Sequence, residues 1–310
     1  MSQFRFADVK VVIADAADLS ASSIRNMLFD KGMREFTVVR DQTGMRDALA
    51  AGDCDLLVTN SHLSDEDISP LLTEIRQGDL GPNPFVPVIS LAWEPSVDNV
   101  ASLLNGGVDV ILTLPLSSDK MDKALEHLLM RRKPFVVTAD YIGPDRRKAP
   151  RPGTQDAPMT VVPNSFKKKA TGKDDADNHA GTVTIIYNQR VESYISRITF
   201  TIGKIVGLTG GDNKGTLSGW MRELRDLSTA LSYRIAATRY AHQEALCHSL
   251  IDITSEMIDR KGGKAQDMDL LQQIALALEI AVKQNDAATV HAAFDIEKMI
   301  ETTLGAAKSR

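Results

Sequence analysis

The sequence contains few cysteines, and this limits the cross-links and metal sites that the chain can form. Of its 310 residues only two are cysteines, Cys54 and Cys247, and they lie far apart. Disulfide frameworks and structural zinc sites use several cysteines at short, regular spacings such as Cys-x-x-Cys. We therefore expect neither a disulfide nor a metal site, and we interpret both thiols as small buried groups.

Long apolar runs are absent as well. No stretch reaches the ~18 uninterrupted apolar residues that a membrane-spanning helix requires. The first ten residues, MSQFRFADVK, are too polar for the hydrophobic part of a signal peptide. The sequence therefore predicts a cytoplasmic chain with no membrane span.

An excess of positive charge and the common catalytic motifs are also missing. The net charge is −5, so DNA is not an expected partner. There is no P-loop, no GxGxxG and no GxSxG, and the glycine-rich stretch 207–215 lacks the Gly-Lys-Ser/Thr ending of a phosphate-binding loop. No two histidines have the i, i+4 spacing of a helical metal site. These absences predict a protein that is not an enzyme and has no cofactor.

The first part of the sequence shows a regular alternation of apolar and amphipathic segments. Such alternation is typical of parallel strands joined by right-handed helical crossovers. Residues 1–133 are therefore expected to form an α/β doubly wound domain with a five-stranded parallel sheet. The strands are expected at 9–14, 36–40, 55–60, 87–92 and 108–115, and the helices at 19–32, 43–52, 67–78, 97–107 and 118–132.

Residues 134–181 have a different composition. The segment contains six prolines, and its central part, 142–173, holds eight Lys or Arg residues against two acids. Few apolar residues are available for a core, so we interpret the segment as a mobile basic linker. Its start, PFVVTADYIG (134–143), is the part best suited to an ordered structure.

The last part, residues 182–310, is expected to form an all-helical domain. After the strand-like TVTIIY (182–187), apolar residues recur every three or four positions, which is the spacing of amphipathic helices. This pattern predicts a helical bundle or coil. The helices are expected at 191–208, 216–261 (as one helix or two), 268–284 and 287–307.

One helical stripe could serve either the core or an interface. Tyr194, Ile198, Ile202 and Ile205 follow one another at helical spacing. Packing inside the domain is the plain interpretation. The alternative is a seam for a second copy of the chain, which would give a homodimer through the C-terminal helices.

Three segments of the first domain resemble the bacterial response-regulator receiver domain, the CheY-like fold. VVIADAAD (11–18) is similar to its first strand and acidic turn, DLLVTN (55–60) to its third strand, and GGVDVILTLPLS (106–117) to its fifth strand. The resemblance covers about two-fifths of the chain. It implies a role in two-component or chemotaxis-type signalling. It also implies a partner-binding face formed by residues 97–105, 109–114 and 118–131.

The resemblance implies five functional positions, and only one of them is kept here. Asp15 stands at the first acidic position, while Ala16, Asn60, Ala92 and Leu114 replace the second acid, the nucleophilic aspartate, the hydroxyl and the lysine. An amide cannot form an acyl phosphate, and a single carboxylate makes a weak magnesium site. We therefore interpret the domain as a pseudo-receiver with a degenerate phosphorylation pocket. The expected function is a phosphorylation-independent adaptor or scaffold for a protein partner.

The stretch YIGPDRRKAPR (141–151) carries the arginines Arg146, Arg147 and Arg151. It could be a solvated linker pinned to the first domain through Phe135 and Tyr141, or a docking element. A third interpretation is an anion or nucleotide site, since RKAPR has the R-x-x-x-R spacing with which PilZ domains bind cyclic di-GMP. The D-x-S-x-x-G motif that such domains also need is absent.

Two histidines, His242 and His248, lie in RYAHQEALCHSL on an expected helix. A phosphotransfer histidine occupies an exposed face of a helical bundle, so these are the candidates if the C-terminal domain relays phosphate. The H-x-L-K-G-like surroundings of such a histidine are missing, and a six-residue gap places the two on different faces of a helix. We interpret them as ordinary bundle histidines and keep the relay as an alternative.

Overall fold

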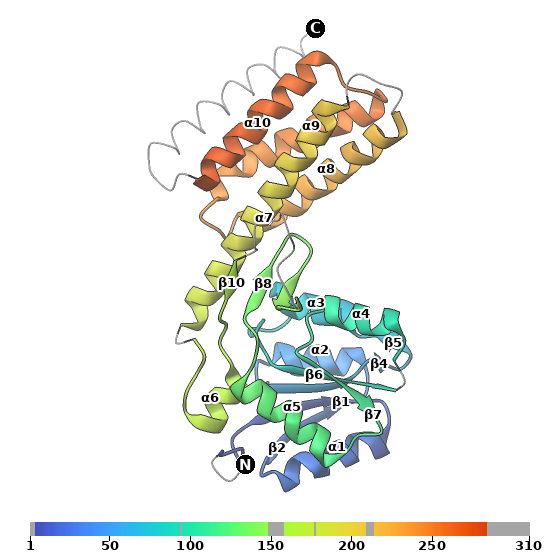
Figure 1. Ribbon diagram of the computed structural model, residues 1–310, viewed down its shortest axis with the longest axis vertical. Coiled ribbons are helices and arrows are strands. Elements are labelled where there is room, and N and C mark those ends of the chain that lie inside the picture. Colours follow the sequence, from blue (N-terminus) through green and yellow to red (C-terminus); the bar gives the residue numbers. More distant parts are fainter. Residues whose placement is uncertain (1–3, 94, 148–157, 177, 209–213, 284–310) are drawn as a thin grey trace. The chain divides into compact units, whose positions relative to one another are not determined.

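The chain is divided into two compact units, residues 1–183 and 184–310, which are described separately (Figure 1). The computed structural model describes residues 4–93, 95–147, 158–176, 178–208 and 214–283. Unit 1 contains the α/β part together with the proline-containing segment that follows it. The division falls between residues 183 and 184, and the segment 134–181, expected as a linker, is assigned to unit 1.

Unit 1 is built on a five-stranded sheet in which all strands are parallel. The strand order is β2-β1-β3-β6-β7, which corresponds to the 2-1-3-4-5 order of flavodoxin-like doubly wound folds. The α/β fold predicted from the sequence is thus confirmed. The strands are β1 (Lys10–Ala14), β2 (Glu35–Val39), β3 (Leu56–Asn60), β6 (Val88–Trp93) and β7 (Val110–Leu114). The crossover helices are α1 (Asp18–Asp30), α2 (Gln42–Ala50), α3 (Ser69–Gln77), α4 (Val97–Asn105) and α5 (Ser118–Met130).

Both faces of the sheet are covered, which explains the apolar character of its strands. Val11 and Ile13 of β1 pack in one buried cluster with α1 and α5. Val12 and Ala14 point to the opposite face and pack with α2, α3 and α4. Figure 1 shows α1 and α5 on one side of the sheet and α3 and α4 on the other. The alternation of side chains along β1 therefore creates two cores from a single strand.

A small hairpin follows β3 where the sequence suggested only a loop. The two-residue strands β4 (His62–Leu63) and β5 (Glu66–Asp67) pair in antiparallel fashion. Ser64 and Asp65 make the turn with φ values of 52° and 67°. Because the hairpin takes up these residues, α3 begins at Ser69, two residues after the start expected at 67.

The interpretation of residues 134–181 as a mobile linker is wrong for the part that the structure describes, except that the start, 134–143, is ordered as expected. Strands β8 (Phe135–Val137), β9 (Ile142–Pro144) and β10 (Met159–Thr160) form an antiparallel sheet in the order β10-β8-β9. Helix α6 (Ser165–Thr171) follows. We call residues 134–147 and 158–176 the strap.

The strap is held by a small number of fully buried apolar side chains. Phe135, Val137 and Phe166 are each 0% exposed. Phe166 joins the core formed by α1 and α5 and stacks on Phe6, with ring centroids 5.7 Å apart. The average composition of the segment is polar, but these few residues are enough to fix it. The average composition of the segment therefore gave the wrong prediction that it is mobile.

The strand suggested by TVTIIY (182–187) does not form, because this stretch lies within α7 (His179–Gly207). β-Branched residues favour strands only weakly when tertiary packing favours a helix. In unit 2, Ile186, Arg190 and Tyr194 are buried at intervals of four residues, which is helical spacing. The periodic burial therefore outweighs the local preference.

Unit 2 is helical throughout the residues that the structure describes. It contains the rest of α7 and then α8 (Lys214–Ile235), the 3-10 turn η1 (Ala241–Gln243), α9 (Glu244–Asp259) and α10 (Ala265–Lys283). The stretch 216–261 thus forms two helices, and α9 contacts both α8 and α10. The predicted helix 287–307 lies outside the described residues.

The apolar stripe of α7 is used inside unit 2. Tyr194, Ile198, Ile202 and Ile205 are at most 6% exposed, as the core interpretation requires. The alternative seam for a second copy is therefore not available at this stripe. Within the described ranges, no helix combines the length and the apolar character needed to cross a bilayer.

Candidate functional site

The carboxyl ends of the parallel strands bring the five expected pocket residues to one edge of the sheet. Asp15 and Ala16 follow β1, and Asn60 ends β3. Ala92 lies near the end of β6, and Leu114 ends β7. The strand register connects them, since β3 pairs with β1 and β6, and β6 pairs with β7. Ligands of open α/β sheets bind outside the carboxyl ends of the strands, so this edge is a candidate binding site.

Asp15 is the only carboxylate of the expected set. It is 2% exposed, and its Oδ1 accepts a hydrogen bond of 2.9 Å from the backbone N–H of Ala17. Its Oδ2 is buried and has no hydrogen-bond partner among the described residues. Ala16 is exposed, and the next acid, Asp18, is paired with Arg40 at 2.5 Å. In the described ranges no group of three His, Cys, Asp or Glu residues could hold a metal ion.

The other expected positions supply neither a nucleophile nor a cation. Asn60 is half-buried and presents an amide, and Ala92 is fully buried. Leu114 packs against the core formed by α1 and α5. This edge therefore presents one buried carboxylate, Asp15, together with an amide and two apolar side chains.

Sequence reasoning missed a lysine at this edge. Lys120, in the first turn of α5, places its Nζ 3.2 Å from the carbonyl oxygen of Thr113 and 3.3 Å from that of Pro115. Its Nζ also lies 3.4 Å from the hydroxyl of Thr113. The ammonium group thus caps the end of β7. A lysine just inside a helix gives no local sign that it will reach back to the preceding strand.

The opposite, amino-terminal edge of the sheet carries a buried ionic cluster. Asp109, one residue before β7, binds Arg76 of α3 at 2.9 Å and Arg132, which follows α5, at 2.7 Å. The three side chains are 1–3% exposed. The Asp109 carboxylate also accepts the backbone N–H of Val88 at 2.9 Å. We call Arg76, Asp109 and Arg132 the buried triad.

The guanidinium group of Arg76 has partners for its charge and for its N–H groups. It donates to the carbonyl oxygens of Pro84, Val86 and Gly107 at 2.7–2.9 Å. Burial lowers the pKa of Arg76 to about 10, and the neighbouring carboxylate of Asp109 opposes this shift. Arg76 therefore stays charged at neutral pH. Buried charges require such complete pairing, because an unpaired ion in a protein interior is very costly.

The strap closes over the buried triad. The guanidinium carbons of Arg76 and Arg132 each lie 5.2 Å from the centre of the Phe135 ring. Phe135 also meets Phe85 edge to face, with centroids 5.9 Å apart. Strand β9 passes so close that a Cβ atom on Gly143 would lie 2.9 Å from the Cα of Gly107. Two glycines thus allow the two backbones to touch.

The expected arginine cluster is divided among separate partners. Arg146 donates to the Asn105 side chain at 2.8 Å and lies 4.1 Å above the Tyr141 ring. Arg147 binds Asp145 at 2.9 Å. Arg151 lies outside the described residues. The two described arginines therefore do not converge on a common point.

The two histidine candidates are both exposed. His242 lies in η1 and His248 in α9, where its Nε2 is 3.7 Å from Glu244 Oε1. Cys54 and Cys247 are free and buried, as expected. Burial raises the pKa of each thiol to about 12, so both are protonated at neutral pH. A protonated thiol is neither a metal ligand nor a nucleophile.

No known family profile and no curated protein matches the sequence. Solved structures that resemble part of the chain are receiver domains. The receiver domain of the sensor histidine kinase PA1611 from Pseudomonas aeruginosa is 20% identical, with a TM-score of 0.35, and the match covers 39% of this chain and 97% of that one. Vibrio cholerae CheY4 is 17% identical, with a TM-score of 0.36 and coverage of 39% and 98%. The fold class itself follows from the strand order described above.

Proposed function

We propose that the chain is a phosphorylation-independent signalling adaptor of a two-component or chemotaxis-type pathway. Unit 1 acts as a pseudo-receiver, and unit 2 provides the helices for a protein partner or for self-association. One observation carries the proposal. At the carboxyl edge of the sheet, Asn60 stands where a phosphoryl-accepting carboxylate would have to be.

The chemistry of this edge supports the proposal. An aspartyl phosphate forms by attack of a carboxylate oxygen, and an amide has no comparable nucleophile. Magnesium is held by near-octahedral oxygen ligands, including one or two carboxylates, and Asp15 has one free oxygen to offer. The ammonium group of Lys120 in α5 donates to the backbone carbonyls of Thr113 and Pro115. The edge is thus suited to a fixed shape and not to a switch.

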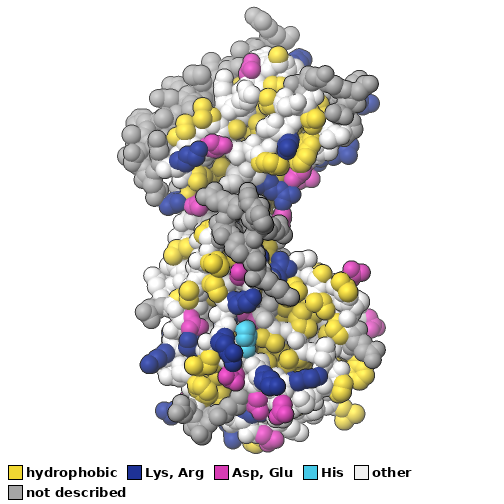
Figure 2. Space-filling view, viewed as in Figure 1, with side chains coloured by type: hydrophobic (Ala, Val, Ile, Leu, Met, Phe, Trp, Pro, Cys, Tyr) yellow, Lys and Arg dark blue, Asp and Glu magenta, His cyan; other side chains and the backbone are white. Residues whose placement is uncertain are grey.

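Exposed apolar side chains at the same edge suit contact with a protein. Val97, which begins α4, is 85% exposed, and Trp93, which ends β6 beside β7, is 67% exposed. Figure 2 shows hydrophobic side chains gathered over the part of unit 1 that holds α4 and β7. β7 is also an edge strand of the sheet. We therefore assign the partner-binding face to α4, β7 and α5.

The adaptor proposal is tested by offering the protein phosphate. Full-length protein is incubated with acetyl phosphate and magnesium, and separately with a mixture of histidine kinases, and its intact mass is measured. We expect no added phosphate, because the nucleophile is absent. A receiver domain with its aspartate in place serves as the positive control.

Phosphate on the protein would contradict the proposal in a way that can be located. Label that disappears in a His242→Ala or His248→Ala variant would establish the relay alternative, since both histidines are exposed. The nucleotide alternative is tested by calorimetry with cyclic di-GMP. Heat of binding that depends on Arg146 and Arg147 would replace the adaptor by an effector.

A further inference from the structure

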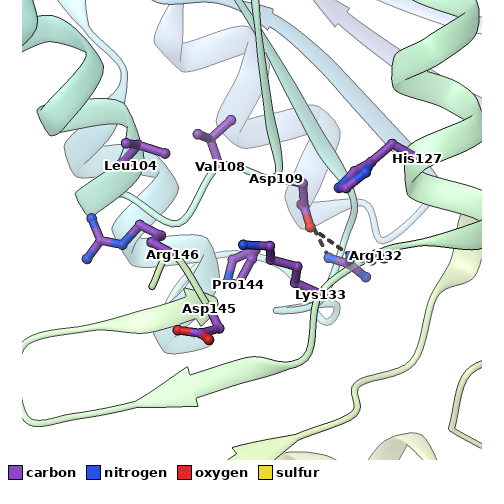
Figure 3. A pocket seen from close by; sticks show the side chains of 9 residues that line it. All are labelled: Leu104, Val108, Asp109, His127, Arg132, Lys133, Pro144, Asp145 and Arg146. Carbon is purple, nitrogen blue, oxygen red and sulfur yellow. Dashed lines mark hydrogen bonds and ion pairs between the residues drawn. The ribbon is translucent and has the colours of Figure 1, made fainter. Parts of the chain in front are cut away.

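A pocket of about 220 Å³ opens at the amino-terminal edge of the sheet in unit 1 (Figure 3). It lies between the turn after α4, the end of α5 and the strap, at the opposite edge from Asn60 and Leu114. We call it the edge pocket. It is lined by Leu104, Val108, Asp109, His127, Arg132, Lys133, Pro144, Asp145 and Arg146.

The residues that line the edge pocket carry more positive than negative charge, with Arg132, Lys133 and Arg146 against Asp109 and Asp145. Its two carboxylates are already neutralised, because Asp109 is held by two arginines of the buried triad and Asp145 is held by Arg147 at 2.9 Å. Lys133 and Arg146 form no ion pair with a carboxylate in the described part of the chain, although the charge of Lys133 helps to hold the pKa of Asp145 below its ordinary value. Both residues are exposed, so they lie at the mouth of the pocket, and Figure 3 shows the guanidinium group of Arg146 on the side of Leu104. Two cations without an ion-paired carboxylate at such a mouth attract an anion.

The two surplus cations also have donors to spare. Lys133 forms no hydrogen bond and no ion pair with any residue that the structure describes, and Figure 3 shows its side chain extending into the middle of the pocket. Arg146 uses Nη1 for Asn105, which leaves Nε and Nη2 without a hydrogen bond in the described part of the chain. Its stacking on Tyr141 fixes the plane of the guanidinium group. A fixed guanidinium and a mobile ammonium form a common pair for holding phosphate.

His127 provides a third polar group, and Figure 3 shows its ring on the wall of the pocket near Asp109. Burial lowers the pKa of His127, with nearby Arg131 and Lys133 adding to the effect and Asp109 opposing it. The ring is therefore neutral at pH 7 and can donate one N–H. Leu104, Val108 and Pro144 form the apolar part of the lining, which strengthens charge interactions inside the pocket.

We propose that the edge pocket binds a small oxyanion, namely inorganic phosphate or the phosphate group of a small molecule. Lys133 and Arg146 hold its oxygens, and His127 donates to it. A volume of about 220 Å³ is smaller than the ~300–1,000 Å³ of sites that enclose a drug-sized ligand, so only a phosphate with a short attachment fits. The ligand would connect α5 to the strap. The site does not depend on the adaptor proposal.

The test is a calorimetric titration, in which each probe is added to the full-length protein and the heat of binding is measured. The probes are inorganic phosphate, pyrophosphate and glycerol 1-phosphate, in a chloride buffer of constant ionic strength. We expect saturable binding at one site. Tighter binding of glycerol 1-phosphate would identify a phosphorylated metabolite as the ligand, and tighter binding of either inorganic probe would identify the free ion.

Variants show whether the pocket is responsible. We expect Lys133→Gln and Arg146→Gln each to weaken binding at least ten-fold while the circular dichroism spectrum stays unchanged. Lys10→Gln and Arg40→Gln are the matched controls, because both remove a cation from a solvent-exposed ion pair of unit 1. Absence of saturable binding with all three probes would overturn the proposal. Equal losses in the control variants would overturn it too, because they would indicate diffuse surface charge.

Discussion

At the scale of single residues, Asp109 is the side chain on which most of the amino-terminal edge depends. It is shared by Arg76 of α3, Arg132 after α5 and the backbone of Val88. Its partners come from segments that are otherwise separate in the sequence. The carboxylate therefore joins the sheet, two helices and, through Phe135, the strap.

Asp109→Asn is expected to destabilise unit 1 by about 3–5 kcal/mol, because it leaves two buried guanidinium groups without a counter-charge. Urea unfolding, followed by pulsed hydrogen exchange of peptides from β6 and β7, measures the loss. Asp53→Asn is the control, since it breaks an ion pair whose side chains are 36% and 71% exposed. Its cost should stay within about 1 kcal/mol. Equal costs for the two variants would disprove the role given to Asp109.

Asp67 gives unit 1 a dependence on pH. Burial opposes its ionisation, but hydrogen bonds from the backbone and hydroxyl of Ser69 and from Ser102 outweigh this, so the pKa of Asp67 is lowered. A lowered pKa contributes stability that is complete above the unfolded value of ~3.9 and is lost as the pH falls through the folded value.

Asp67→Ala should therefore cost about 1–3 kcal/mol at pH 7, and this cost should shrink as the pH is lowered from 4 towards 3. Urea unfolding of both proteins at several pH values gives the difference. Glu66→Ala, at the exposed neighbouring position, is the control. A difference that remains constant down to pH 3 would contradict the assignment.

The sequence predicted which residues lie at the carboxyl edge of the sheet in unit 1, but it did not predict the residues at the amino-terminal edge. Asp15, Asn60 and Leu114 could be placed because each stands at the end of an apolar run, and strand ends meet at one edge of a parallel sheet. Asp109 could not, because its arginine partners are 33 and 23 residues away and neither spacing forms a motif. The arginines of the 141–151 stretch drew attention through their number, whereas Arg76 and Arg132 were hidden in ordinary helical segments.

At the scale of elements, the strap is an integral part of the α/β domain. The strands and helices before it were predictable because hydrophobic periodicity reports local burial. Most of the strap was not, since Phe166 stands alone in a polar stretch and Phe135 starts a run of only three apolar residues, and both gain their partners only in the folded chain. The strand expected at TVTIIY fails for a different reason, because its β-branched residues favour a strand locally and the helical burial pattern of α7 outweighs that preference.

We therefore expect a fragment that ends at residue 133 to lack a stable fold, whereas the fragment 1–183 should fold. It lacks four fully or nearly fully buried side chains, Phe135, Val137, Ile142 and Phe166. Each contributes about 1.5–3 kcal/mol, and their sum approaches the ~5–15 kcal/mol that stabilises a typical domain. Near-ultraviolet circular dichroism and binding of a hydrophobic dye compare the two fragments. Equal melting temperatures would show that the strap is dispensable.

At the scale of the whole molecule, we propose different roles for the two units, with a partner-binding face on unit 1 and helices for a partner or for self-association in unit 2. Unit 1 offers the exposed residues Leu19, Trp93 and Val97, while the apolar stripe of α7 is buried within unit 2. A homodimer through the C-terminal helices would need other side chains, such as the exposed Phe200, Tyr233 and Leu276.

Affinity capture with the full chain and with residues 184–310 alone separates the contributions of the two units. We expect the full chain to recover a signalling protein, and Trp93→Ala together with Val97→Ala to reduce the yield at least several-fold. Tyr233→Ala is the control for an exposed aromatic residue outside unit 1. Full recovery by the double variant would move the partner site away from α4.

The closure of unit 1 by the strap has a consequence for the order of events during protein synthesis. Phe166 completes a core whose first strand begins at Lys10, so the ribosome must make roughly 40 residues beyond α5 before the domain can close. At ~5–20 residues per second this takes about 2–8 s, during which α1 and α5 have an uncovered apolar surface. A nascent chain halted in this interval would be a natural client for chaperones.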